Sequence, residues 1–213
     1  RLVEAGRLRE DVFQLFLRNV RLPRYQALDL KGQIAANNVA RFKIVEVAQR
    51  YGTDTLKAAY EDIIAHSEAK TVARIRQLPP GRYQATERLD FDRIYTLRCA
   101  LIVEGDSLTF DFAGTDPQSP AFVNSAFATI EANVHNILTC LLLPDIPANE
   151  GCFRRVKVLI PEGTLLNCRP PAACSGASVV TGWKAQVLAI KVLSQALLRS
   201  PEVAEFAFPL PHD

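Results

Sequence analysis

Apolar residues in the first part of the chain recur at the three- to four-residue spacing of helices that bury one face. This spacing predicts three helices, at 8–20, about 29–51 and about 53–77. Pro23 stops or redirects the chain between the first two, because a proline inside a helix removes a backbone hydrogen bond. Gly52 follows the second helix and supplies the left-handed backbone with which many helices end.

After these helices the pattern changes to the alternation of apolar and polar positions that is typical of half-buried strands. Two alternating runs, at 95–103 and 108–112, flank the turn-forming residues 104–107 and predict a β-hairpin. Residues 83–89 are a candidate third strand of the same sheet.

The remaining pattern predicts helices at about 124–143 and 180–199, with a short strand at 156–160 between them. We therefore predict an α+β fold with an N-terminal helical segment at 1–78. A mixed segment at 79–213 follows, with antiparallel hairpins and packed helices. One continuous domain is the alternative, because no flexible linker separates the two segments.

Composition and charge narrow the functional classes. The 213 residues are 48% hydrophobic and carry a net charge of +2, which argues against disorder and gives no electrostatic case for nucleic acid or an anionic membrane. No apolar run approaches the length of a transmembrane helix. The chain begins at Arg1 and contains no Met, so we expect a portion of a longer, multi-domain subunit.

Cysteine usage indicates the compartment. An odd number of cysteines without CxxC spacing fits neither a disulfide framework nor a zinc knuckle, so we expect reduced thiols and a cytoplasmic protein. Two of them, Cys99 and Cys140, fall within apolar patterns and are expected in the core. The five cysteines are Cys99, Cys140, Cys152, Cys168 and Cys174.

Motifs for a P-loop, a dinucleotide-binding turn and a nucleophile elbow are absent from the sequence. His66 and His135 lie in predicted helices without HxxxH spacing, and we expect both to be polar-face or hydrogen-bonded core residues. We therefore predict no metal ligands in this chain.

A first polar cluster lies on the second predicted helix. Asp29, Gln33 and Asn37 are spaced four residues apart and so share one helix face. The small residues beside them would allow a ligand or another backbone to approach closely. Two interpretations stay open: a binding surface, or a capping Asp29 with two amides that bond neighbouring loops.

A second cluster follows the predicted hairpin and comprises Asp111, Thr115, Gln118 and Asn124. Loops at strand ends often carry binding groups, because the sheet fixes their position. Asp111 is a candidate general base, metal ligand or Asx-turn residue.

A third cluster contains Asn149 and Arg154. Arg154 could hold a carboxylate or phosphate with two parallel hydrogen bonds, or it could be a solvated surface arginine.

Together these clusters resemble the motifs of the hydantoinase B/oxoprolinase family, both in their order along the chain and in their residue types. The resemblance covers about residues 18–200, and three substitutions depart from the family pattern: Leu28 for Gly, Gly32 for Ala and Pro80 for Asp. The matching stretches are 28–37, Tyr51-Gly52, Glu68, Arg74, 78–83, 111–118, Asn124, Pro147, Asn149, Gly151, 161–163, Leu166-Asn167 and 170–172.

The resemblance implies a B-type subunit of an enzyme that opens a cyclic amide, such as a hydantoin or 5-oxoproline, at the expense of ATP. Phosphorylation of the amide oxygen would activate the amide carbon, so that water could attack it and open the ring. A partner A-type subunit or domain would bind the nucleotide, in a homo- or hetero-oligomer. ATP and a divalent metal belong to the full complex in this interpretation, and neither is expected to bind this stretch alone.

The resemblance also assigns roles to the polar residues, with Asp29 and Asp111 as catalytic candidates. One wall of the site would carry Asp29 and its helix neighbours, and the loop after the hairpin would form the opposite wall. The substrate-binding candidates are Gln33, Asn37, Thr115, Gln118, Asn124, Asn149 and Arg154.

Two alternatives stay open. A related acetone or acetophenone carboxylase would use the same activation to carboxylate a ketone. The chain could also be a structural or interface portion whose chemistry lies elsewhere in the subunit.

Overall fold

The computed structural model describes residues 1–200, which divide into two units. The first is Arg1–Tyr60 and the second begins at Glu61, so the division falls inside one helix, α3 (Thr53–Ile75). Each unit is described by itself.

The first unit holds a short hairpin, two helices and the start of α3. The hairpin pairs β1 (Val3–Glu4) with β2 (Arg7–Leu8) and precedes α1 (Glu10–Arg18) and α2 (Pro23–Tyr51). This hairpin takes up the beginning of the first predicted helix.

The prediction that α2 starts near residue 29 was wrong. Pro23 lies in the first turn of the helix and does not interrupt it. A proline is well tolerated there, because the first backbone N–H groups of a helix have no partner within it. Gly52 ends α2 with φ of 86°, as expected.

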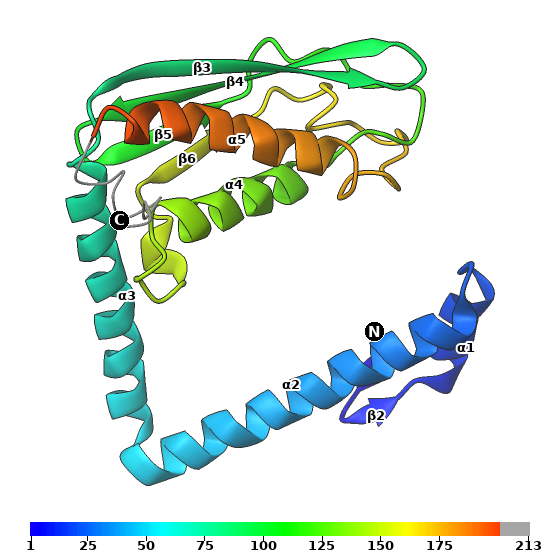
Figure 1. The fold of residues 1–213 in the computed structure, drawn as a ribbon. Coiled ribbons are helices and arrows are strands. Elements are labelled where there is room, and N and C mark those ends of the chain that lie inside the picture. The colour runs from blue at the N-terminus through cyan, green and yellow to red at the C-terminus, as the bar shows by residue number, and fades with distance from the viewer. Residues whose placement is uncertain (201–213) are drawn as a thin grey trace, which may run out of the picture. The chain divides into compact units, whose positions relative to one another are not determined.

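The second unit is built on a four-stranded sheet (Figure 1). Its strands lie in the order β3 (Gly81–Asp90), β4 (Ile94–Glu104), β5 (Ser107–Asp111) and β6 (Val156–Leu159). The first three are antiparallel, which confirms the predicted hairpin and third strand. β6 joins β5 in parallel and therefore returns through a crossover that contains a helix.

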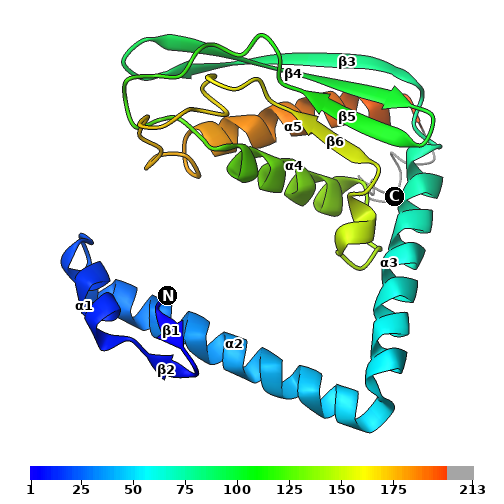
Figure 2. The same cartoon turned by 180° about the vertical axis from the view of Figure 1, so that it is seen from behind.

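One face of this sheet forms the core. Tyr83, Leu101 and Phe110 are in register across β3, β4 and β5 and are buried. Two helices, α4 (Phe127–Leu141) and α5 (Thr181–Leu197), lie on this face, as Figures 1 and 2 both show. The α+β fold class is confirmed.

The opposite face of β3 and β4 is polar. Its side chains alternate with the core residues, as the strand period requires. They include Arg82, Gln84, Thr86, Arg88 and Arg98.

Two further expectations were wrong in detail. Cys140 is exposed, because it lies on the side of α4 away from the buried Val134 and Leu138, whereas Cys99 is buried as expected. α4 begins at Phe127 and not at 124, because the preceding residues form the polar loop described below. Within residues 1–200, no helix is long and apolar enough to cross a membrane.

Candidate functional site

The loop that follows β5 is fastened to β4 by two of its side chains. Thr115, which is 7% exposed, accepts a hydrogen bond from the backbone N–H of Arg98 at 3.1 Å and donates to its carbonyl at 3.3 Å. The carboxylate of Asp116 accepts from the N–H of Thr96 at 2.8 Å. These bonds extend the ladder beyond β5, so Thr115 shapes the loop through backbone contacts.

Gln118 and Asn124 connect this loop to a second one at 168–174. The side-chain oxygen of Gln118 accepts from the N–H of Arg169 at 2.8 Å. Asn124 is fully buried and accepts from the N–H of Ser119 at 2.7 Å. Its amide group donates to the carbonyls of Ser119, Ala121 and Ala173 at 2.9–3.1 Å. Both amide hydrogens of Asn124 are therefore engaged within the protein.

Asn149 shapes the turn before the 3-10 helix η1 (Glu150–Cys152). Its oxygen accepts from the N–H of Gly151 at 2.9 Å, and its amide group donates to the hydroxyl of Ser67 on α3 at 2.7 Å. Gly151 packs so closely on α3 that an added Cβ would overlap the carbonyl of Ile64. Asn149 thus holds this turn against α3.

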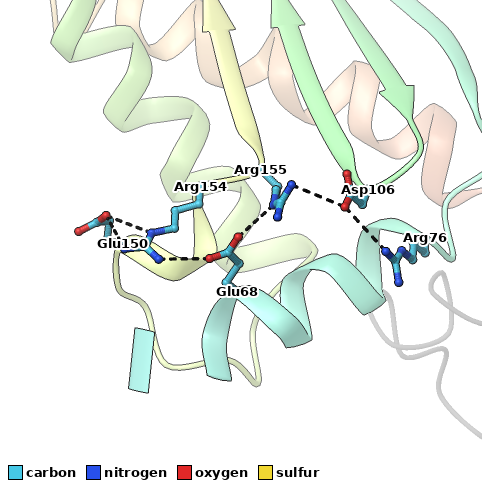
Figure 3. A network of polar contacts seen from close by, with 6 residues as sticks. All are labelled: Glu68, Arg76, Asp106, Glu150, Arg154 and Arg155. Atoms are coloured by element: carbon cyan, nitrogen blue, oxygen red, sulfur yellow. Dashed lines mark hydrogen bonds and ion pairs between the residues drawn. The ribbon is translucent and has the colours of Figure 1, made fainter. Parts of the chain in front are cut away.

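Arg154 belongs to a network of ion pairs on the surface of the second unit (Figure 3). It bridges Glu150 and Glu68 at 3.1 and 3.2 Å. Arg155 bonds the other oxygen of Glu68 at 3.0 Å and approaches Asp106 at 3.7 Å. Hydrogen bonds from Arg154, and next from Arg155, hold the pKa of Glu68 below its usual range. The guanidinium of Arg154 is therefore occupied by protein carboxylates.

Asp111 has a different environment at the end of β5. One carboxylate oxygen accepts from the N–H of Ala113 at 3.0 Å, which is the Asx-turn contact that the sequence left open. The other lies 3.5 Å from the guanidinium of Arg82, and the side chain is 20% exposed. The carboxylate is thus fixed in position while part of it stays accessible.

The charges of Asp111 and Arg82 also act on the pKa of the neighbouring Cys99. Burial raises the pKa of this thiol well above its usual range, the charge of Asp111 raises it further, and Arg82 opposes the rise. A raised pKa disfavours the thiolate, which is the reactive form of a cysteine.

Two hollows lie beside Asp111. A cavity of about 220 Å³ on the polar face of the sheet is lined by Arg82, Gln84, Thr86, Arg98 and Ala113, among others. A second, more open depression of about 450 Å³ is lined by Asp111 itself, together with residues of β6, Phe127 and Asn167. Arg82 thus reaches from the first hollow to the carboxylate that lines the second.

Arg82 and Arg98 were not among the predicted site residues. The alternation along β3 and β4 does predict that both arginines lie on the polar face, opposite the apolar face. Which of the polar-face residues would approach Asp111 depends on strand register, and the sequence pattern does not specify it.

The cluster on α2 lies in the first unit. Asp29, Gln33 and Asn37 are exposed there, and their spacing within one helix places them on a common face. Asp111 belongs to the second unit, so the structure describes the two proposed walls separately.

No candidate metal site is found among the described residues. Among residues 1–200, no three His, Cys, Asp or Glu side chains are grouped so that they could hold a metal ion. The sequence also lacks a P-loop. No step through a metal or ATP is therefore assigned to this chain.

Comparison with known proteins identifies the family of the chain. The family model described as Hydantoinase B/oxoprolinase matches residues 1–205. The chain belongs to this family. The resemblance found in the sequence is thereby confirmed, although the chain spans only about a third of the length of the curated relatives it matches first.

Two relatives of the hydantoinase B/oxoprolinase chain differ in the chemistry that their names state. The caprolactamase subunit beta of Pseudomonas jessenii is 31% identical, over 81% of this chain and 30% of that protein. The acetophenone carboxylase delta subunit of Aromatoleum aromaticum is 26% identical, over 82% of this chain and 26% of that protein.

A solved structure shares the fold. The crystal structure of the ATP-dependent caprolactamase from Pseudomonas jessenii superposes with a TM-score of 0.85 at 28% identity. The match covers 93% of this chain and 35% of that one.

Proposed function

We propose that this chain is part of the B-type subunit of an ATP-dependent enzyme that opens a cyclic amide. The observation that carries the proposal is the family match over residues 1–205, joined to the similarity with the caprolactamase subunit beta and its structure. A hydantoin, 5-oxoproline or a lactam is the substrate class. In this proposal an A-type partner binds the nucleotide, and ATP and the divalent metal belong to the full complex, as in the ATP-dependent caprolactamase to which the chain is similar.

Within this chain, Asp111 is the residue that we propose faces the substrate. It lines an open depression, and the bond from Ala113 fixes its orientation. A carboxylate held in this way can accept a hydrogen from a ring N–H or from the attacking water. Arg82 and Arg98 bring positive charge to the neighbouring hollow, where it would favour a negatively charged oxygen of the substrate or intermediate.

The other candidates divide into two groups. Asp29, Gln33 and Asn37 are proposed to form a second wall, because their side chains are exposed on α2. The remaining candidates are proposed as positioning residues, because their polar groups bond the protein itself. These are Thr115, Gln118, Asn124, Asn149 and Arg154.

The test of the proposed reaction uses the full-length subunit with its partner. Phosphate release from ATP is measured with a hydantoin, 5-oxoproline and caprolactam as substrates, and the ring-opened product is quantified. We expect release to depend on one of these cyclic amides and to match product formation. Phosphate release that requires a ketone and bicarbonate, with no response to cyclic amides, would contradict the proposal.

Replacement of Asp111 tests the role of this chain in the reaction. We expect Asp111→Asn in the complex to lower kcat by at least about 100-fold, the usual scale for loss of a proton acceptor. Asp90→Asn, at the exposed end of β3 in the same sheet, is the matched control and should leave turnover unchanged. Unchanged turnover of Asp111→Asn would exclude a catalytic role.

Carboxylation of a ketone is the second candidate, and the similarity to the acetophenone carboxylase delta subunit favours it. The same assay with acetone or acetophenone and labelled bicarbonate separates the two reactions. Incorporation of the bicarbonate label into an acid-stable product would identify the enzyme as a carboxylase.

A further inference from the structure

A pair of cysteines lies in the loop that contacts Gln118 and Asn124. The sulfur atoms of Cys168 and Cys174 are 3.1 Å apart, and both residues are partly exposed. They are six positions apart in the sequence, and no other cysteine falls between them. A disulfide requires a sulfur separation of about 2 Å, so a shift of about 1 Å would join them.

The loop that carries the pair is anchored at both ends. The N–H of Cys168 donates to the carbonyl of Ser125 at 2.9 Å, and the carbonyl of Ala173 accepts from Asn124 at 3.1 Å. These bonds fix the backbone beside each cysteine, and both residues remain partly exposed. The two sulfur atoms are therefore kept close by the fold itself and do not meet through random closure of a free loop.

We propose that Cys168 and Cys174 are a modification site that forms a reversible intramolecular disulfide with a small-molecule disulfide as oxidant. This chemistry is independent of the proposed amide-opening function. It also refines the expectation of reduced thiols, because the pair would respond to the thiol–disulfide balance around the protein.

The reaction proceeds by two exchange steps. One cysteine thiolate attacks a sulfur of the added disulfide, such as oxidised glutathione, forms a mixed disulfide and releases one molecule of the small thiol. The second cysteine attacks the protein sulfur of that mixed disulfide and releases the other small thiol. The cysteine pair loses two electrons, the oxidant gains them, and the two thiol protons end on the released thiols.

The environment of Cys168 predicts the pH dependence of this oxidation. Burial, followed by the hydrogen bond with Cys174, raises the pKa of Cys168 to about 11. Because the thiolate is the reactive form, we expect oxidation to be slow near neutral pH and to accelerate steadily as the pH rises.

The sequence makes the site easy to measure. Trypsin does not cleave Arg169-Pro170, so both cysteines fall in one peptide, residues 158–184, which contains no other cysteine. The full-length subunit is incubated with oxidised glutathione, alkylated, digested and analysed by mass spectrometry. We expect this peptide to become lighter by two hydrogens, to carry no alkyl group and to return to the dialkylated form after dithiothreitol.

A synthetic peptide of residues 158–184 is the matched control for chance proximity. We expect the equilibrium constant for disulfide formation to be at least about tenfold larger in the folded subunit than in the peptide, because the fold raises the effective concentration of the second thiol. An equal or smaller constant in the folded subunit would overturn the proposal. Dialkylated cysteines throughout the titration would overturn it as well.

A substitution at Cys174 tests whether the second thiol is needed to release glutathione. We expect Cys174→Ser to stop at a stable glutathione adduct on Cys168, whereas Cys140→Ser, at an exposed site on α4, should leave the disulfide intact. Should Cys174→Ser fail to fold, the comparison of the wild-type subunit with the peptide still decides the proposal.

Discussion

Gly151 occupies a position where the backbone of α3 leaves no room for a side chain. An added Cβ would overlap the carbonyl of Ile64 and lie 2.9 Å from the N–H of Glu68. We expect Gly151→Ala to lower the free energy of unfolding by about 3 kcal/mol, because backbone atoms cannot yield as a flexible side chain can. Urea unfolding of the full-length subunit measures this loss. Glu150→Ala, at the adjacent exposed residue, should change it by about 0.5 kcal/mol or less.

Asn124 allows a structural role to be separated from a substrate-binding role. We expect Asn124→Ala to destabilise the protein by about 2–4 kcal/mol, because it leaves buried backbone groups without partners. Asn136→Ala, on the exposed side of α4, is the control and should be nearly neutral. An Asn124→Ala enzyme with unchanged stability and a raised KM would instead identify Asn124 as a substrate contact.

These residues show what the sequence can reveal about a site. The motif pattern identified Asn124, Asn149 and Arg154 as special positions, but residue type alone does not tell a substrate ligand from an internal hydrogen-bond partner. That distinction depends on which carbonyls and carboxylates the fold brings near, and those of Ala173 and Glu68 are distant in sequence.

At the scale of elements, Glu87 links strand β3 to helix α5. Its side chain is 13% exposed and pairs with Lys184 at 3.1 Å and with Lys191. The hydrogen bond from Lys191 is the main cause that lowers the pKa of Glu87 below its ordinary value of about 4.5. A lowered pKa means that the folded state favours the ionised carboxylate. The stabilisation of the folded state by ionised Glu87 is therefore present above pH 4.5 and is lost as the pH falls through the folded-state pKa.

We therefore expect Glu87→Gln to reduce the free energy of unfolding by about 1–2 kcal/mol at pH 7. The difference from wild type should shrink as the pH falls below 4.5, because the wild-type carboxylate then becomes neutral too. Unfolding measured across pH checks both points. Glu162→Gln, whose ion pair with Arg169 is mostly exposed, should have little effect at any pH. A Glu87→Gln effect that stays constant across this range would contradict the linkage.

Some helices and strands could be predicted from the sequence and others could not. The β4–β5 hairpin followed from alternation and a turn, which are local signals. The parallel pairing of β6 with β5 was not predictable, because Val158 meets Phe110 only through a crossover of more than forty residues. The start of α2 was misjudged because Pro23 can either end a helix or open one, and the sequence alone does not say which.

At the scale of the whole chain, α2 differs in burial from the described helices of the second unit. None of its 29 residues is buried. A helix without a packed face is marginal in water, because tertiary contacts supply most helical stability. Large apolar side chains nevertheless lie exposed along it, at Tyr25, Leu28, Val39, Phe42, Ile44, Val45, Val47 and Tyr51.

We expect the rest of the full-length subunit to cover this helix, since the chain represents about a third of its relatives. Hydrogen–deuterium exchange of residues 1–213 alone, compared with the full-length subunit, tests this expectation. Amides of α2 should exchange at least about tenfold faster in the isolated chain, whereas those of β4, whose side chains are largely buried within the described sheet, should change little. Equal protection of α2 in both samples would show that the helix is stable without further contacts. Its apolar residues would then need another explanation.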